Sequence, residues 1–393
     1  MSELASAVRT ALAGVIDPEI HRPITELGMV DSVIAHPDGR VDVRVLLTIA
    51  GCPLQSTIEA DVNAAVLGVE GVTALNLELG TMSDEQRAAL KKQLRGGRDE
   101  REIPFAKAGN LTQVILIASG KGGVGKSSVT VNLAMALAGR GKRVGVLDAD
   151  IYGHSIPQML GLVDANPTSV DGMILPVPAM GLTVISIGML KERRDQVIAW
   201  RGPILDRALQ QFLADVYWGD LDFLLVDLPP GTGDVALSLG QKLPNAEVIV
   251  VTTPQQASAE VAERAGTMAS MFDQRVIGVV ENMAYLNVSC PHCAQTHRVD
   301  VFGSGGGQAV ASTLTERLGY EVPLLAEVPM DPAMATSGDV GVPLVATDAA
   351  RPAAAVLDGL AHPMGGPPLH GHERHRGGGR GGLHEDLPDA APQ

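Results

Sequence analysis

Hydrophobic positions between residues 111 and 361 alternate between two patterns. Short apolar runs rich in β-branched residues are separated by segments whose apolar residues have helical spacing. The apolar runs are 113–118, 144–147, 184–187, 223–226, 248–251 and 276–280. Strands that alternate with helices indicate βαβ units, so we expect an α/β fold with a mostly parallel sheet and helices on both faces.

Residues 1–95 have a different pattern, which reads as helix, two strands, helix, strand, helix. The paired strands are expected at 30–36 and 41–47, joined by a Pro-Asp-Gly turn. Ser83 and Gln86 have the spacing of a capping box and predict a helix that runs to about residue 95. The sequence therefore predicts a small α+β domain before the larger one.

Two polar segments flank the larger domain. Residues 96–110 show no apolar period and are expected to be a linker, while residues 362–393 are rich in Gly, Pro and His. The final segment has too few apolar residues to form a core, so we expect a disordered tail. Its histidines either are solvated or chelate metal transiently. The predicted organisation is 1–95, linker 96–110, 111–361 and tail 362–393.

Charge, cysteine content and apolar run length indicate which partners and which cellular compartment to expect. The formal charge is 30 − 45 = −15, which argues against a nucleic-acid partner. The three cysteines do not make a disulfide framework. No secretory signal is visible, and the apolar runs are too short to cross a membrane. We expect a cytoplasmic protein without membrane attachment.

The strongest chemical motif follows the first strand of the larger domain. Residues 120–127 read Gly-Lys-Gly-Gly-Val-Gly-Lys-Ser and precede a helical pattern. In such a loop the backbone N–H groups cradle phosphates, Lys126 reaches the β- and γ-phosphates of ATP, and the Ser127 hydroxyl binds Mg²⁺. A glycine-rich turn with a chance lysine is the alternative, and the strand–helix context disfavours it. The predicted nucleotide-binding residues are Gly120, Lys121, Gly122, Gly123, Val124, Gly125, Lys126 and Ser127.

Three aspartates stand at or just after the ends of predicted strands, which are the ends where α/β sheets bind ligands. We predict that Asp227 binds Mg²⁺ through water and that Asp150 orients the attacking water. Helix capping is the alternative for each, and it is most plausible for Asp148.

These motifs resemble a known family. The early Lys121, in addition to Lys126, is similar to the deviant Walker A loop of the MinD, ParA and nitrogenase-iron-protein class. Residues 119–127, 148–157, 227–234 and 281–283 together resemble the Mrp family of iron–sulfur carrier ATPases. The resemblance covers 111–361, and residues 1–95 resemble the iron–sulfur assembly domain often fused there. His154 departs from the pattern, where proline is expected.

The resemblance implies a homodimer that hydrolyses ATP. It implies that Lys121 reaches the partner's nucleotide, that Lys121, Lys126, Asp150 and Asp227 support hydrolysis, and that Asn282 lies near the base. It also implies apo iron–sulfur proteins and the cluster assembly machinery as partners.

The cysteines supply the second candidate site. Cys290 and Cys293 form a CxxC motif, which by itself is compatible with a metal or cluster site, a redox dithiol or two buried thiols. Two thiolates cannot complete a four-thiolate cluster site, but a symmetric dimer supplies four. The resemblance favours a [4Fe–4S] cluster that bridges the dimer. Zinc bound together with His292 or His297 stays open as an alternative.

Cys52 stands before a predicted helix and is either a reactive thiol at a helix N-terminus or a small buried residue. The related assembly domains carry a cysteine there.

The leading hypothesis is an ATP-dependent iron–sulfur cluster carrier. The alternative is a positioning or partitioning ATPase, which is disfavoured by the Gly/His-rich end and the negative charge. A metal-inserting GTPase is a further option, but no guanine-reading motif is evident.

Overall fold

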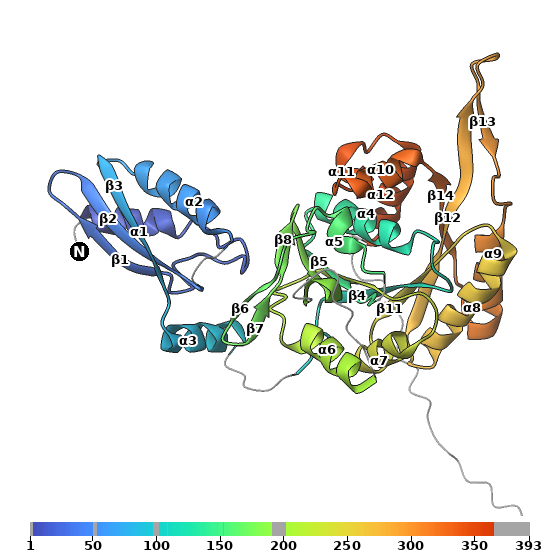
Figure 1. The fold of residues 1–393 in the computed structure, drawn as a ribbon, viewed down its shortest axis with the longest axis horizontal. Helices are drawn as coiled ribbons and strands as arrows, with labels where there is room; N and C mark the ends of the chain where they lie inside the picture. Colours follow the sequence, from blue (N-terminus) through green and yellow to red (C-terminus); the bar gives the residue numbers. More distant parts are fainter. Residues whose placement is uncertain are drawn as a thin grey trace, which may run out of the picture.

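The computed structural model describes residues 3–49, 53–96, 102–107, 109–151, 153–190 and 202–364 (Figure 1). Cys52 and the predicted disordered tail from residue 365 onward lie outside these ranges. Residues 362–364, which were predicted to begin the tail, instead end the helix α12 (Pro352–Met364).

The N-terminal region has the element order that its sequence predicts. The elements are α1 (Glu3–Leu12), β1 (Val30–Ala35), β2 (Arg40–Leu47), α2 (Gln55–Leu67), β3 (Ala74–Thr81) and α3 (Asp84–Leu94). Strand β2 pairs antiparallel with β1 and parallel with β3. The predicted capping box is confirmed, because the Gln86 N–H donates to Ser83 Oγ and the Ser83 N–H donates to Gln86 Oε1.

The larger region is built on one nine-stranded sheet, which confirms the α/β expectation. The strand order is β13-β12-β11-β4-β10-β5-β9-β8, with β14 also paired to β12. Two of the pairings, β12–β13 and β8–β9, are antiparallel, and the others are parallel. The strands are β4 (Gln113–Ser119), β5 (Val144–Asp148), β8 (Val177–Ala179), β9 (Leu182–Ser186), β10 (Phe223–Asp227), β11 (Glu247–Thr252), β12 (Arg275–Ser289), β13 (Thr296–Val299) and β14 (Leu324–Met330).

Helices cover both faces of this sheet (Figure 1). One face carries α4 (Lys126–Gly139), α5 (Ile156–Met159), α10 (Pro332–Asp339), α11 (Leu344–Thr347) and α12. The other carries α6 (Gly202–Ala214), α7 (Asp234–Lys242), α8 (Gln256–Ser270) and α9 (Gly306–Leu318). Successive residues of β4 enter opposite layers, since Leu116 packs in one core and Ile117 in the other. Burial on both faces explains why the sheet strands read as continuous apolar runs.

A short hairpin within the sequence of the larger region packs against the N-terminal region. It consists of β6 (Thr168–Val170) and β7 (Met173–Leu175), and its apolar residues share the hydrophobic core of the N-terminal sheet. Lys91 of α3 binds Asp171 in the hairpin turn, and Arg95 binds Asp215. Part of the predicted linker is also packed, because Phe105 is buried with its ring 6.3 Å from that of Trp218.

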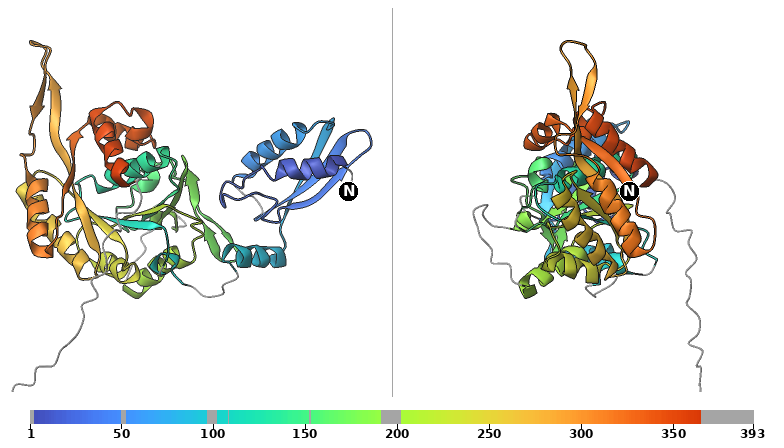
Figure 2. Two further views of the ribbon diagram at one scale, coloured as in Figure 1. Left: turned by 180° about the vertical axis from the view of Figure 1, so that it is seen from behind. Right: turned by 90° about the vertical axis from the view of Figure 1, so that its right-hand side faces the viewer.

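The strand β12 extends well beyond the predicted 276–280. It runs for fifteen residues and, with β13, projects from the body of the molecule as a hairpin (Figure 2). We call residues 284–299 the arm. Met283 has φ +55° next to a register shift against β14, so β12 bends where the arm leaves the sheet. No helix within the described ranges is long and apolar enough to span a membrane.

Candidate functional site

The loop after β4 has the backbone geometry of a phosphate cradle. Helix α4 begins at Lys126, and Gly125 before it has φ +78°. A Cβ at Gly125 would lie 2.2 Å from Asn282 Nδ2, and one at Gly120 would lie 2.3 Å from the carbonyl carbon of Val261. Both positions therefore require glycine, and the helix N-terminus faces the space above the loop.

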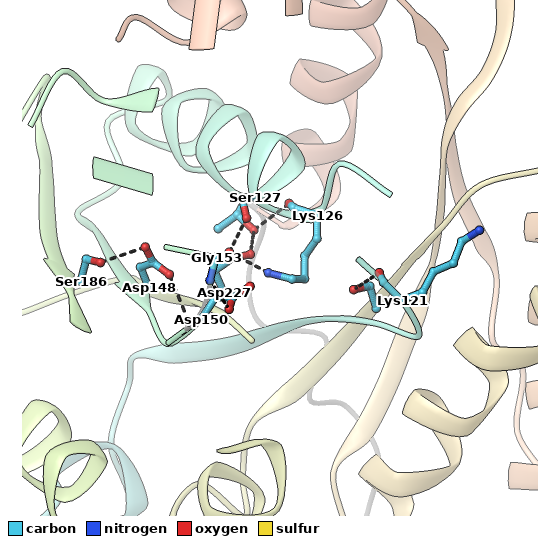
Figure 3. A network of polar contacts seen from close by, with 10 residues as sticks. Lys121, Lys126, Ser127, Asp148, Asp150, Gly153, Ser186 and Asp227 are labelled. Carbon is cyan, nitrogen blue, oxygen red and sulfur yellow. Dashed lines mark hydrogen bonds and ion pairs between the residues drawn. The ribbon is translucent and has the colours of Figure 1, made fainter. Parts of the chain in front are cut away.

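Lys126, Ser127 and Asp227 meet at the floor of this loop (Figure 3). Lys126 Nζ lies 2.7 Å from Asp227 Oδ2, and Ser127 Oγ donates to the same oxygen at 2.6 Å. The hydroxyl of Thr130 donates to Asp227 Oδ1 at 2.8 Å. Asp227 is fully buried, so its carboxylate is held by three neighbours in a dry setting.

The ammonium group of Lys126 is only partly satisfied there. It is buried, and beyond its charge contact with Asp227 it has no hydrogen-bond partner of suitable geometry among the described residues. A buried cation with unused donors is costly unless an anion completes it. This fits a phosphate group above the loop.

The two carboxylates after β5 have different environments. Asp148 is fully buried and accepts hydrogen bonds from Ser186 Oγ at 2.9 Å and from the Asp150 N–H at 3.2 Å. Burial, reinforced by the charge of Asp227, raises the pKa of Asp148 to about 8. Through these two hydrogen bonds Asp148 connects Ser186 at the end of β9 to the backbone of Asp150. Asp150 accepts from the Gly153 N–H at 2.9 Å and lines the open cavity.

A cavity of about 760 Å³ lies over the loop. The predicted site residues that line it are Lys121, Gly122, Gly123, Val124, Gly125, Lys126, Ser127 and Asp150. A cavity of this size accepts a nucleotide. Ser127 Oγ and Asp227 Oδ2 lie 2.6 Å apart, and Mg²⁺ prefers oxygen ligands of these types.

Lys121 points away from this cluster (Figure 3). Its Nζ donates to Gln255 Oε1 at 3.1 Å, beyond the end of β11. In this chain the Lys121 ammonium group therefore does not contact the cluster of Lys126, Ser127 and Asp227, although Lys121 is among the residues that line the cavity.

Asn282 lies behind the loop. Its Nδ2 donates to the Val124 carbonyl at 2.9 Å, and the residue is buried outside the cavity lining. The predicted contact with a base stays a prediction, while the bond to the loop is present. His154, the departure from the family pattern, packs its ring over Gly188, where a Cβ would lie 2.8 Å from His154 Cγ.

Cys290 and Cys293 lie between the end of β12 and the start of β13, in the turn of the arm. Figure 2 shows this hairpin projecting from the body of the molecule. Cys290 is half-buried and Cys293 is exposed. Backbone N–H groups of Cys293 and His292 hydrogen-bond the Cys290 sulfur and lower the pKa of that thiol. Cys293 Sγ lies 3.3 Å from His297 Nε2.

Several contributing residues were not singled out by the sequence. Thr130 is four residues after Lys126, so helical spacing could have found it. Ser186 ends β9 beside Asp148, and Gln255 follows β11, but neither belongs to a motif.

Comparisons with known proteins agree with this geometry. The family described as "NUBPL iron-transfer P-loop NTPase" matches residues 110–364, and "Iron-sulfur cluster assembly protein" matches residues 5–77. A protein of Mycobacterium tuberculosis named iron-sulfur cluster carrier protein is 58% identical over 87% of this chain and 88% of its own length. One of the same name from Deinococcus radiodurans is 42% identical over 92% and 94%.

A solved structure is also similar. It is a nucleotide-binding protein from Archaeoglobus fulgidus in complex with ADP, with cobalt found by PIXE, at 37% identity and a TM-score of 0.51 over 62% of this chain and 92% of that one. With the P-loop and the N-terminal α+β region both matched, this chain belongs to the NUBPL-type iron-transfer P-loop NTPases, a family of ATPases, and carries the iron–sulfur assembly domain before its NTPase domain.

Proposed function

We propose that this protein is an ATP-dependent iron–sulfur cluster carrier that works as a homodimer and delivers its cluster to apo-proteins. The observation that carries the proposal is the pair of thiols in the turn at the arm tip, where Cys290 is half-buried and Cys293 is exposed. This turn follows β12, the strand whose Asn282 hydrogen-bonds the phosphate loop. The names of relatives at 58% and 42% identity support the carrier role. The cobalt reported for the similar ADP-bound protein supports metal affinity in such a chain.

The cluster would be bound between two copies of the chain. Each chain offers Cys290 and Cys293, while a [4Fe–4S] cluster takes four cysteine ligands. Two arms brought together supply the four thiolates. Because Cys293 is exposed and Cys290 is only half-buried, an acceptor protein can reach the cluster without unfolding the carrier.

The roles at the phosphate site follow from charge and contact. The unused donors of Lys126 would neutralise the β- and γ-phosphates, and the loop's backbone N–H groups would hold their oxygens. Ser127 and, through water, Asp227 would hold Mg²⁺, which supplies further positive charge beside the phosphates. Asp150 would orient the attacking water from the cavity wall.

Lys121 would act across the dimer. Its side chain points away from its own cluster of Lys126 and Asp227 and is held by Gln255. A second chain facing this surface could receive the ammonium group at its own γ-phosphate. ATP binding and dimer closure would then be linked, and the cluster would be released or exposed as the dimer opens. We propose the reducing cytoplasm as the setting, with the cluster assembly machinery as the source of the cluster.

Anaerobic reconstitution of the full chain tests the proposal. We expect about one four-iron cluster per dimer, transferable to an apo-protein. Cys290→Ser and Cys293→Ser should each remove the cluster absorption and the transfer, while ATP hydrolysis persists. Cys52→Ser is the matched thiol control and should keep the cluster. A full cluster in both serine variants of the arm would overturn the carrier assignment.

A further inference from the structure

The arm tip brings a third metal-binding side chain to the two thiols. The sulfur atoms of Cys290 and Cys293 and a ring nitrogen of His297 all lie within 4.8 Å of one another. All three belong to one chain. Within the described residues, this is the single group of three or more Cys, His, Asp or Glu side chains with that spacing.

The backbone fixes this arrangement. Strands β12 and β13 pair antiparallel with Ser289 opposite Thr296 and Val288 opposite His297, so the ladder sets the position of His297 beside the turn. The turn is closed by two hydrogen bonds, from the Cys290 N–H to the Gln295 carbonyl and from the Ala294 N–H to the Cys290 carbonyl, both at 2.9 Å. The proximity of the ligands therefore does not depend on long flexible side chains.

The turn itself has a form suited to metal thiolates. Ala294 has φ +55°, a conformation that a residue with a Cβ adopts at a cost of about 1 kcal/mol. The N–H groups of Cys293 and His292 hydrogen-bond the Cys290 sulfur. Amide donors directed at sulfur stabilise the thiolate, which is the form that binds metal.

His292 does not share this geometry. It lies inside the turn between the two cysteines, is exposed, and is not among the three clustered ligands. The rings of the two histidines of this hairpin therefore differ in whether they reach both thiols.

From this geometry we propose that Cys290, Cys293 and His297 of a single chain bind one divalent metal ion with a preference for tetrahedral sulfur and nitrogen ligands, such as Zn²⁺, Co²⁺ or Fe²⁺, and leave its fourth position open. Thiolate and imidazole suit these ions, and three protein ligands with an open position are typical of sites that exchange a ligand. Binding of the ion displaces the protons of both thiols. The inference rests on the proposed function because it uses the same two thiols.

The third ligand changes what one chain can do alone. With two thiols per chain, metal would be held firmly only after dimerisation. With His297, a separate chain would hold an ion with three ligands, whereas a [4Fe–4S] cluster delivered to the dimer would take the four thiolates and need no imidazole. His297 would therefore serve as the third metal ligand while the chain is not dimerised.

Titration of the reduced, metal-free full chain with Co²⁺ tests this. We expect the visible bands of tetrahedral Co²⁺ with thiolate charge-transfer absorption, at one ion per chain, with an affinity that does not change on dilution. Zn²⁺ should displace the Co²⁺. His297→Gln should weaken Co²⁺ binding about tenfold or more, and the matched variant His292→Gln should leave it unchanged. ATP hydrolysis of both variants checks that they are folded.

The outcomes separate the two proposals. If His297→Gln binds Co²⁺ with the wild-type affinity and spectrum, or if one Co²⁺ is bound per two chains, the third-ligand inference is overturned while the carrier proposal stands. If His297→Gln loses Co²⁺ but still assembles one cluster per dimer, the inference holds as stated. If Cys290→Ser keeps the full Co²⁺ spectrum, the thiols are not ligands and both proposals are overturned.

Discussion

The phosphate loop and the arm tip are connected by one strand but are built in opposite ways. At the loop, Asp227 is fully buried and contacted by Lys126, Ser127 and Thr130. At the tip, the thiols are half-buried or exposed and are positioned by a turn and a two-stranded ladder. The side chains at the phosphate loop are held in place by one another without a ligand. The arm tip of one chain offers three metal ligands, which is fewer than a four-coordinate ion needs. The first arrangement favours preorganised chemistry, and the second favours exchange with another molecule.

The sharpest way to separate the two sites is Lys126→Ala. We expect ATP hydrolysis to fall by about 100-fold or more, because the phosphates lose their buried cation. Metal binding at the arm should be unchanged, because no tip residue contacts Lys126. Lys92→Ala, an exposed lysine on α3, is the control and should keep both activities. Circular dichroism should confirm folding, since Asp227 loses its cationic neighbour. Wild-type turnover in Lys126→Ala would rule out the phosphate-site assignment.

Lys121→Ala should have the next largest effect. We expect hydrolysis to fall by about tenfold or more while ATP affinity stays within about threefold, because Lys121 does not contact its own phosphate floor. Wild-type turnover per chain should also rise with protein concentration. A rate independent of concentration, or an ATP affinity that falls in step with turnover, would contradict a role across the dimer.

Asp148→Asn should expose the pH sensitivity of the buried site. A carboxyl whose pKa is raised on folding, here from 3.8 to about 8, contributes most to stability at low pH and loses that contribution as the pH rises toward 8. The asparagine side chain does not titrate, so the variant does not lose this stability as the pH rises. Measured by urea unfolding, the free energy of unfolding of the variant should therefore gain on that of the wild type by roughly 3 to 4 kcal/mol between pH 5 and pH 8. Parallel stability curves for the two proteins would mean that Asp148 is ionised throughout.

Asn282→Ala tests the support that β12 gives to the loop. Loss of the hydrogen bond to the Val124 carbonyl should weaken ATP binding by about fivefold, which corresponds to about 1 kcal/mol. Asn287→Ala is the matched control, an exposed asparagine on the same strand. Equal affinities in the two variants would show that the loop keeps its shape without Asn282.

The smallest effect is expected for Arg298→Ala in the arm. Its guanidinium lies 4.0 Å from the centre of the half-buried Tyr285 ring and 3.1 Å from Glu327, and the Arg298 and Glu327 side chains are exposed. Their loss should lower Co²⁺ affinity by about two- to fivefold, or up to about 1 kcal/mol, and leave ATP hydrolysis unchanged. A much larger loss of Co²⁺ affinity would indicate that the contacts of Arg298 with Tyr285 and Glu327 determine the conformation of the arm.

Sequence reasoning succeeded where local pattern determines structure. The apolar runs predicted the sheet strands, and the Ser83–Gln86 pair predicted the start of α3, because burial and capping act over a few residues. It also marked Asp227 and Lys126, whose close contact the structure contains, because parallel strand ends meet at one edge of the sheet.

It failed where partners are distant along the chain. The polar, exposed outer half of β12 lacks the apolar signal of a strand, so the arm was not predicted. The choice between His292 and His297 beside Cys293 depends on the β12–β13 register, which no local pattern encodes. The burial of Phe105 against Trp218 within a polar segment is likewise a tertiary effect.

The length of β12 has a mechanical consequence. Asn282 is anchored to the phosphate loop, and Cys290 follows after eight residues, which span at most roughly 26 Å at about 3.3 Å per residue because the chain bends at Met283. A rotation of the strand by one degree at its anchored end moves the thiols by roughly 0.5 Å over that length. A small rotation of β12 at the phosphate loop therefore produces a larger displacement of the thiols at the tip of the arm.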